Sequence, residues 1–445
     1  MTPLRERLRP NPHDREIVRL AVPALGALVA EPLYVLADTA VVGRLGSEPL
    51  AGLAVASSLL LIIFSLFIFL AYGTTASVAR LIGAGNPRRA AHQAVQGMWL
   101  AVFVGVAVSI IVLAFSSPLV GLLGATGGVR EQALTYLRIS LLGVPAMLLV
   151  LAGTGYLRGL QDTRTPLVIS VVSATANLVL ECILVFGFDF GIGASALTTV
   201  FAQWGAATVY VIWVRRAVQR HEVQLIPHPA TLREISVVGR DLFIRTAALR
   251  SAFLVATAVA TRIGTVDVAA HQIALEIWNA LALMLDAIAI AGQSLIGKLL
   301  GASDVDDAHA AGRRMLLWGL VFGVLAGALV LLVRNAVPGI FTDDVLVRDL
   351  TAFLLVFVAI MQPVNGIVFV LDGLLIGAGD MRFLAWAMVL AAAVFIPCAL
   401  LVLEFNGGIG WLWASLLLLM VVRGLTLGIR WISDAWAIPG AEVAR

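Results

Sequence analysis

Two carboxylates stand seven residues apart in the first long apolar stretch of the chain, in the run AEPLYVLADTAVVG at residues 30–43. Seven residues are nearly two helical turns, so Glu31 and Asp38 would share one face of a helix, together with Pro23. A carboxylate inside a bilayer costs about 3 kcal/mol. We therefore expect Asp38 to face a cavity or a partner, the alternative being a side chain that reaches the membrane interface. Glu31 could equally have only a local role beside Pro32.

A second polar stripe lies in the run SVVSATANLVLE, where Ser170, Ser173, Asn177 and Glu181 follow one another at helical spacing. Two carboxylates held together in an apolar surrounding do not both stay ionised easily, so such a pair binds a proton or a cation. The Asn177 amide can bind Na⁺ through its oxygen or form a hydrogen bond with a protonated acid. The stripe therefore predicts an ion site, and the alternative for Glu181 is again a side chain at the membrane interface.

The second half of the chain carries its own intramembrane polar residues, namely Asp286, Gln293, Asn365, Asp372 and Arg250. An Arg–Asp pair between helices neutralises two charges at once, so either acid could pair with the arginine for structural reasons alone. The same residues could instead line a substrate cavity. The sequence leaves both alternatives open.

These residues belong to an integral membrane protein, because the 445 residues are 60% hydrophobic and only 13% charged. Apolar runs of membrane-spanning length predict an all-α protein of about twelve helices. The predicted spans are residues 17–42, 50–77, 93–116, 132–157, 166–187, 192–214, 241–263, 270–297, 312–333, 351–376, 383–403 and 409–430.

The chain also repeats itself at an offset of 218 residues, which relates Gly159 to Gly377 and Pro145 to Pro363. The repeat predicts two parallel six-helix lobes, an arrangement that suits alternating access better than a static scaffold or channel. At this offset Asp38 and Glu181 correspond to alanines, so the repeated architecture does not require the acids. The predicted parts are a lead-in 1–16, an N-lobe 17–214, a linker 215–240, a C-lobe 241–430 and a tail 431–445.

Arginine and lysine gather in the loops after even-numbered helices, in residues 215–240 and in the lead-in. Positive charge marks the cytoplasmic side, so both termini are expected in the cytoplasm and the chain in the inner (plasma) membrane. The two cysteines predict neither disulfide nor metal site. The sequence has no P-loop, HExxH or GxSxG motif, which argues against an enzyme and against ATP as the energy source. Nothing supports nucleic-acid binding.

Several motifs together resemble the multidrug and toxic compound extrusion (MATE) family over nearly the whole chain. They are AEPLYVLADTAVVGRLGSEPLAGLAVA, ARLIGAGNPRRA, YLRGLQDTRTPL and VDVAAHQI, and FVLDGLLIGAGD is similar to the DinF-type branch, which includes plant carboxylate exporters. The resemblance implies two six-helix lobes around a V-shaped cavity and exchange of substrate for H⁺ or Na⁺.

Carried over by motif, the resemblance implies an ion-coupling site at Asp38, Asn177, Glu181 and Thr199, with helix bending at Pro23. This branch usually has aspartate at the position of Glu181. The longer side chain favours a proton over Na⁺, although Na⁺ at Asp38, Asn177 and Glu181 stays open.

The sequence thus predicts an antiporter that exports a small organic substrate, drug-like and cationic, in exchange for H⁺. The alternatives are a lipid-linked flippase and an organic-anion exporter. Candidate residues of the substrate cavity are Glu31, Tyr34, Asp286, Gln293, Asn365, Asp372 and Arg250. No cofactor is expected beyond the coupling ion, and the expected partners are the small-molecule substrate and the lipid bilayer, with the protein as a monomer.

Overall fold

The computed structural model describes residues 11–188 and 190–441. Within these ranges twelve stretches are helical, long and apolar enough to cross a membrane. Such helices satisfy every backbone hydrogen bond within the segment, which the bilayer core demands. The predicted all-α fold with about twelve membrane helices is confirmed.

The helices of the first half are α2 (Pro12–Val42), α3 (Ser47–Phe67), α4 (Phe69–Gly83), α5 (Pro87–Ala114), α6 (Ser116–Leu122), α7 (Gly127–Ser140), α8 (Val144–Gly159), α9 (Arg164–Cys182) and α10 (Ile192–His221). Those of the second half are α11 (Pro229–Ile263), α12 (Thr265–Gly301), α13 (Val305–Val333), α14 (Val345–Ala378), α15 (Met381–Glu404) and α16 (Gly408–Ile432). Short turns η1 (Gly43–Leu45), η2 (Leu141–Gly143), η3 (Ile183–Gly187) and η4 (Val337–Ile340) complete the described elements.

The helices extend past the apolar stretches that predict them. Of the predicted linker 215–240, only residues 222–228 lie between helices, because α10 continues to His221 and α11 begins at Pro229. Arginine and glutamate favour helix as well as leucine does, so a helix need not end where its hydrophobicity ends. Hydropathy therefore predicts the membrane crossing and not the helix terminus.

The chain forms two compact units, which we call unit 1 (Met1–Leu25 with Arg240–Arg445) and unit 2 (Gly26–Gly239). Unit 2 contains α3–α10 and most of α2. Unit 1 contains α12–α16, most of α11 and the first part of α2. The long helix α2 thus passes from one unit to the other between Leu25 and Gly26.

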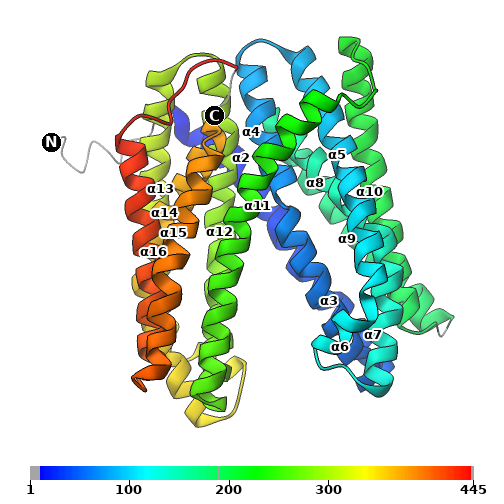
Figure 1. Ribbon diagram of the computed structural model, residues 1–445, viewed down its shortest axis with the longest axis vertical. Coiled ribbons are helices and arrows are strands. Elements are labelled where there is room, and N and C mark those ends of the chain that lie inside the picture. The colour runs from blue at the N-terminus through cyan, green and yellow to red at the C-terminus, as the bar shows by residue number, and fades with distance from the viewer. Residues whose placement is uncertain (1–10, 189, 442–445) are drawn as a thin grey trace. The chain divides into compact units, whose positions relative to one another are not determined.

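Glycines allow one helix to pack closely at the centre of each unit. In unit 1, α14 packs against α12 and α13 (Figure 1). A methyl group at Gly377 of α14 would lie only 2.6 Å from the backbone oxygen of Gln293. In unit 2, α8 packs against α4 and α5, and a methyl group at Gly159 would lie 2.6 Å from Cβ of Val78. Small residues permit this backbone approach between membrane helices.

A second pair of contacts repeats at the same offset. A methyl group at Gly105 would lie 2.6 Å from Cα of Pro145 in unit 2, and one at Gly323 would lie 3.0 Å from Cα of Pro363 in unit 1. The two glycines are 218 residues apart in the sequence, and so are the two prolines. The sequence repeat is therefore also a repeat of packing.

Candidate functional site

Asp38 lies buried in unit 2, with only 4% of its surface exposed. The hydroxyl of Ser195, at the start of α10, donates a hydrogen bond of 2.7 Å to Oδ1 of Asp38. The hydroxyl of Tyr136 from α7 points to Oδ2 at 3.5 Å, a long contact. Three helices, α2, α7 and α10, thus converge on one buried carboxylate.

Thr199 and Tyr34 form the next layer of this site. The Thr199 hydroxyl donates to the backbone oxygen of Ser195 at 3.1 Å and lies 2.7 Å from the Tyr34 hydroxyl. A hydroxyl has one proton to donate, so Tyr34 is the donor to Thr199. Thr199 therefore holds the α10 backbone at Ser195 and orients Tyr34. The part of the chain that the structure describes shows no hydrogen bond from Thr199 to Asp38.

Glu181 and Asn177 of α9 are almost completely buried, with 0% and 1% of their surfaces exposed. The Glu181 carboxyl adjoins Asp38 and Ser195. Among the described residues, neither oxygen of Glu181 and neither amide atom of Asn177 has a hydrogen-bond partner. Burying an unpaired polar group costs about 1–3 kcal/mol, and an ionised one costs more. These side chains are therefore expensive for the fold, which is typical of a functional site.

A small apolar cluster joins the segments that carry the site residues. Val41, Val185 and Ala194 form a buried group from α2, η3 and α10, against which Leu178 and Cys182 pack. The turn η3, directly after α9, is π-helical. Single π-helical turns within helical segments are frequent at functional sites. This turn starts two residues after Glu181, and its Val185 belongs to the apolar cluster.

The structure thus brings together four residues that the sequence singled out, Asp38, Asn177, Glu181 and Thr199, with Tyr34 beside them. Whether they couple to an ion remains a prediction. Glu31 shares the helical face of Asp38 but is exposed in the structure. Pro23 lies inside α2, which continues through it as a single helix.

Sequence reasoning missed Ser195 and Tyr136. Ser195 precedes Thr199 by four residues and so lies on the same face of α10, which was a usable signal. Tyr136 is one tyrosine on a helix of mixed composition. Its approach to Asp38 across 98 residues depends on how α7 packs.

In unit 1, Asp372 of α14 is held by two arginines. Its Oδ2 accepts a hydrogen bond of 2.8 Å from Arg245 of α11 and a second from Arg423 of α16. Asp372 and Arg423 are buried, with 6% and 3% of their surfaces exposed. A pocket beside this group is otherwise lined by apolar side chains, among them Leu384 and Met388. The sequence placed Asp372 in the interior but did not identify either arginine.

The other candidates of the second half differ in burial, and Asp286 lies close enough to Arg423 to interact with its charge. Gln293 and Asn365 are buried, and the side-chain amide oxygen of each has no hydrogen-bond partner among the described residues. Asp286 is half-buried and Arg250 is exposed. Gln293 also forms the surface on which Gly377 packs, which gives it a structural position between α12 and α14.

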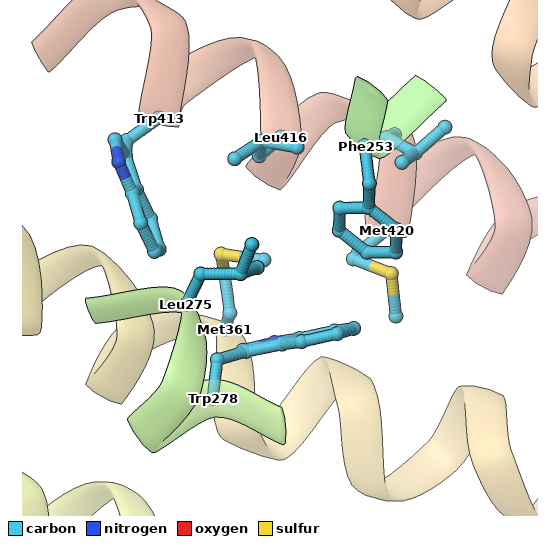
Figure 2. Close-up of a pocket in the computed structure, with 8 residues that line it drawn as sticks. Phe253, Leu275, Trp278, Met361, Trp413, Leu416 and Met420 are labelled. Atoms are coloured by element: carbon cyan, nitrogen blue, oxygen red, sulfur yellow. The ribbon is translucent and has the colours of Figure 1, made fainter. Parts of the chain in front are cut away.

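Unit 1 also encloses a small apolar pocket, shown in Figure 2. Trp278 and Leu275 of α12 lie opposite Trp413, Leu416 and Met420 of α16. The cavity of about 10 Å³ barely admits one water molecule. It is therefore a space between packed side chains and too small for an organic substrate in this conformation.

The unpaired amide of Asn177 gives a test that separates function from folding. Asn177→Leu is expected to leave the free energy of unfolding unchanged or to raise it by about 1–3 kcal/mol, because an unsatisfied buried amide is replaced by an apolar group of similar size. Substrate transport is expected to fall at least tenfold, since the amide lies beside Tyr34 and one helical turn before Glu181 in the candidate site. Unfolding in detergent and transport in proteoliposomes measure the two effects. Thr175→Val, on the exposed side of α9, should change neither, and a variant that loses stability and transport together would indicate a structural asparagine.

The MatE family model matches residues 23–183 and again residues 242–401, once in each half of the chain. Protein DETOXIFICATION 44, chloroplastic, of Arabidopsis thaliana is 33% identical over 92% of this chain and 80% of its own length. DNA damage-inducible protein F of Escherichia coli is 29% identical over 94% of this chain and 92% of its own length.

Solved structures share the fold. The crystal structure of the Vibrio cholerae MATE transporter VcmN in the bent form has a TM-score of 0.86 and 21% identity, covering 95% of this chain and 96% of that one. Each match of the family model covers most or all of the first five of the six membrane helices in its half of the chain. The chain therefore belongs to the MatE family, the multidrug and toxic compound extrusion transporters, in its DinF-type branch.

Proposed function

We propose that this membrane transporter is an antiporter that exports a small organic substrate and takes up H⁺ in exchange. The carrying observation is the buried group in unit 2, where the carboxyls of Asp38 and Glu181 adjoin each other. A proton bound by this pair neutralises a charge that the apolar interior disfavours. Release of that proton to the other side of the membrane would supply the energy for export.

The asymmetry between the halves supports a role beyond architecture. At the repeat offset, the counterparts of Asp38 and Glu181 are Ala256 and Ala399, and both alanines are buried with 0% exposure. Helices at these positions therefore pack well without an acid. Unit 2 instead buries the acids Asp38 and Glu181 at these positions, and Glu181 has no hydrogen-bond donor among the described residues. A costly feature present in only one of two similar units suggests selection for function.

Several contacts favour H⁺ over Na⁺ as the coupling ion. Each oxygen of Asp38 faces a hydroxyl, from Ser195 and from Tyr136. A hard cation needs several oxygen lone pairs directed at it, so these hydroxyl protons would have to turn away. A proton needs only one lone pair, and the unpaired oxygens of Glu181 offer it. Na⁺ is the second candidate ion.

Ion binding would act as a shift between two conformational states. A ligand changes an equilibrium only through its different affinity for the two states. Protonation of Asp38 and Glu181 would change the charge inside unit 2 and thereby favour one arrangement of α2, α9 and α10. We place a bend of α2 at Pro23, where the ring removes a hydrogen bond to the carbonyl of Arg19.

We propose that the substrate is an organic cation. The acidic site would release this cation when its carboxyls take up protons in exchange. The name of the Arabidopsis relative, which refers to detoxification, is consistent with a foreign substrate. The charge in unit 1 favours a second candidate, an organic anion, because two arginines face Asp372. We further propose a monomer in the inner membrane, with both termini cytoplasmic.

The test uses purified protein in liposomes loaded with ethidium, and in parallel with citrate. A pH gradient without a Na⁺ gradient is expected to drive ethidium movement, and a Na⁺ gradient without a pH gradient is expected to drive none. Ethidium movement driven by a Na⁺ gradient alone would show that Na⁺, and not H⁺, is the coupling ion. Movement of citrate but not of ethidium would show that the substrate is an organic anion and not a cation. Absence of any gradient-driven movement would contradict the antiport function.

A further inference from the structure

The first part of α2 is fastened to unit 1 by a charged contact that the proton site does not include. Nε and Nη2 of Arg314, on α13, donate hydrogen bonds of 2.6 and 2.7 Å to the two oxygens of Asp14. The indole N–H of Trp318 donates a third, of 2.8 Å, to Oδ1 of Asp14. The two parallel bonds of an arginine to one carboxylate fix orientation as well as distance. One turn of α13 therefore holds Asp14 by three hydrogen bonds.

Neighbouring residues strengthen this attachment. The ring nitrogen Nε2 of His13 lies 3.2 Å from Oδ1 of Asp307, also on α13. Ile17, Leu20 and Ala24 follow at helical spacing, and each has at most 2% of its surface exposed. This part of α2 is thus attached to unit 1 by an apolar stripe and, at its start, by the Asp14 contact.

The other part of α2 carries Asp38 in unit 2. The helix is continuous from Pro12 to Val42, and Asp38 follows Asp14 by 24 residues along it. Within the unit 2 part, a methyl group at Gly26 would lie 2.9 Å from Leu167 of α9, so α2 also packs closely there. One helix is therefore fixed in unit 1 at Asp14 and in unit 2 at Gly26 and Asp38.

We propose that Asp14, with Arg314 and Trp318, is a positioning site for transport: it anchors α2 to unit 1, so that a change at Asp38 is transmitted to unit 1. The proposal rests on the proposed antiport function. Asp14 touches neither the proton nor the substrate. A helix whose two ends are held in different units couples them, even if it bends between the two attachments, only while both attachments persist, because a released end absorbs the motion.

The test compares proton binding with transport in the full-length protein. Asp14→Asn keeps the size of the side chain and removes its charge. We expect substrate-induced proton release in detergent to stay within twofold of the unaltered protein, because Asp38 and Glu181 are intact. Ethidium movement driven by a pH gradient is expected to fall about tenfold. Asp306→Asn, an exposed acid in the first turn of α13, is the matched control and should change neither.

A charge swap makes the test independent of a general loss of folding. Asp14→Arg combined with Arg314→Asp restores an ion pair in the reverse order and is expected to recover at least half of the driven transport. Unchanged transport in Asp14→Asn would overturn the proposal. Loss of proton release in parallel with the melting temperature, without recovery in the swap, would also overturn it and leave a purely structural contact. Absence of proton release in the unaltered protein would instead reject the antiport function.

Discussion

Asp38→Asn is expected to reduce transport driven by a pH gradient to the level of protein-free liposomes. Asparagine keeps the shape of the side chain and can still accept the hydrogen bond of 2.7 Å from Ser195. It cannot bind and release a proton between pH 5 and 9. The variant is therefore expected to fold and to bind substrate, with coupling alone removed.

Three measurements check this result: driven ethidium movement, substrate-induced proton release and the melting temperature in detergent. Proton release is expected to fall along with transport. The melting temperature should shift only slightly, by an amount that corresponds to less than about 1 kcal/mol in the free energy of unfolding, since the shape of the side chain is retained. Thr39→Val is the control, because Thr39 is the next residue, is exposed and bonds only to its own helix at Val35. Gradient-driven transport that persists in Asp38→Asn would exclude Asp38 as the coupling residue.

Asp38→Glu sharpens the test, since it retains the carboxyl and moves it by one methylene. We expect part of the driven transport to remain, because proton exchange is still possible although the contact with Ser195 is altered. A pattern in which Asn is inactive and Glu partly active would show that the carboxyl group matters beyond its volume.

Asp372→Asn is expected to destabilise the protein by about 3–5 kcal/mol, the usual effect of removing one partner from a buried ion pair. The aspartate lies between Arg245 and Arg423, and Arg423 has only 3% of its surface exposed. Without the carboxylate, the guanidinium of Arg423 would remain buried with no opposite charge from α14. The melting temperature in detergent measures the loss.

A second variant shows whether the pair or the aspartate alone is responsible. Asp372→Asn combined with Arg423→Gln removes the aspartate together with the more deeply buried of its two arginines, and it is expected to be more stable than the single variant, because Arg423 no longer lies in the interior without the carboxylate and only Arg245 has lost it. Asp349→Asn, an exposed acid on the same helix α14, should alter the melting temperature little. Normal stability with lost transport in Asp372→Asn would instead place Asp372 in the substrate path.

The sequence was sufficient for the membrane helices and for the repeat. Hydropathy over about twenty residues is a local property, and the bilayer makes it decisive. The glycines and prolines that mark the repeat, such as Gly159 and Gly377, are the residues at the closest helix contacts. Their type was therefore already set by packing, which explains why they were visible in the sequence.

The sequence also singled out two acids that meet in the structure, because a carboxylate in an apolar helix stands out by its cost. Asp38 and Glu181 lie on helices separated by more than a hundred residues and meet in the structure. Their types and spacing indicated the chemistry. That they share one site in unit 2 required the packing of α2 against α9 and α10.

Only the tertiary structure decided the partners of these acids. Ser195 and Tyr136 approach Asp38, Arg245 and Arg423 bind Asp372, and Arg314 binds Asp14. Glu31 repeats the helical position of Asp38 and is nevertheless exposed. Periodicity tells which residues share a face, but the rotation and neighbours of each helix determine what that face meets, and these arise from contacts distant in sequence.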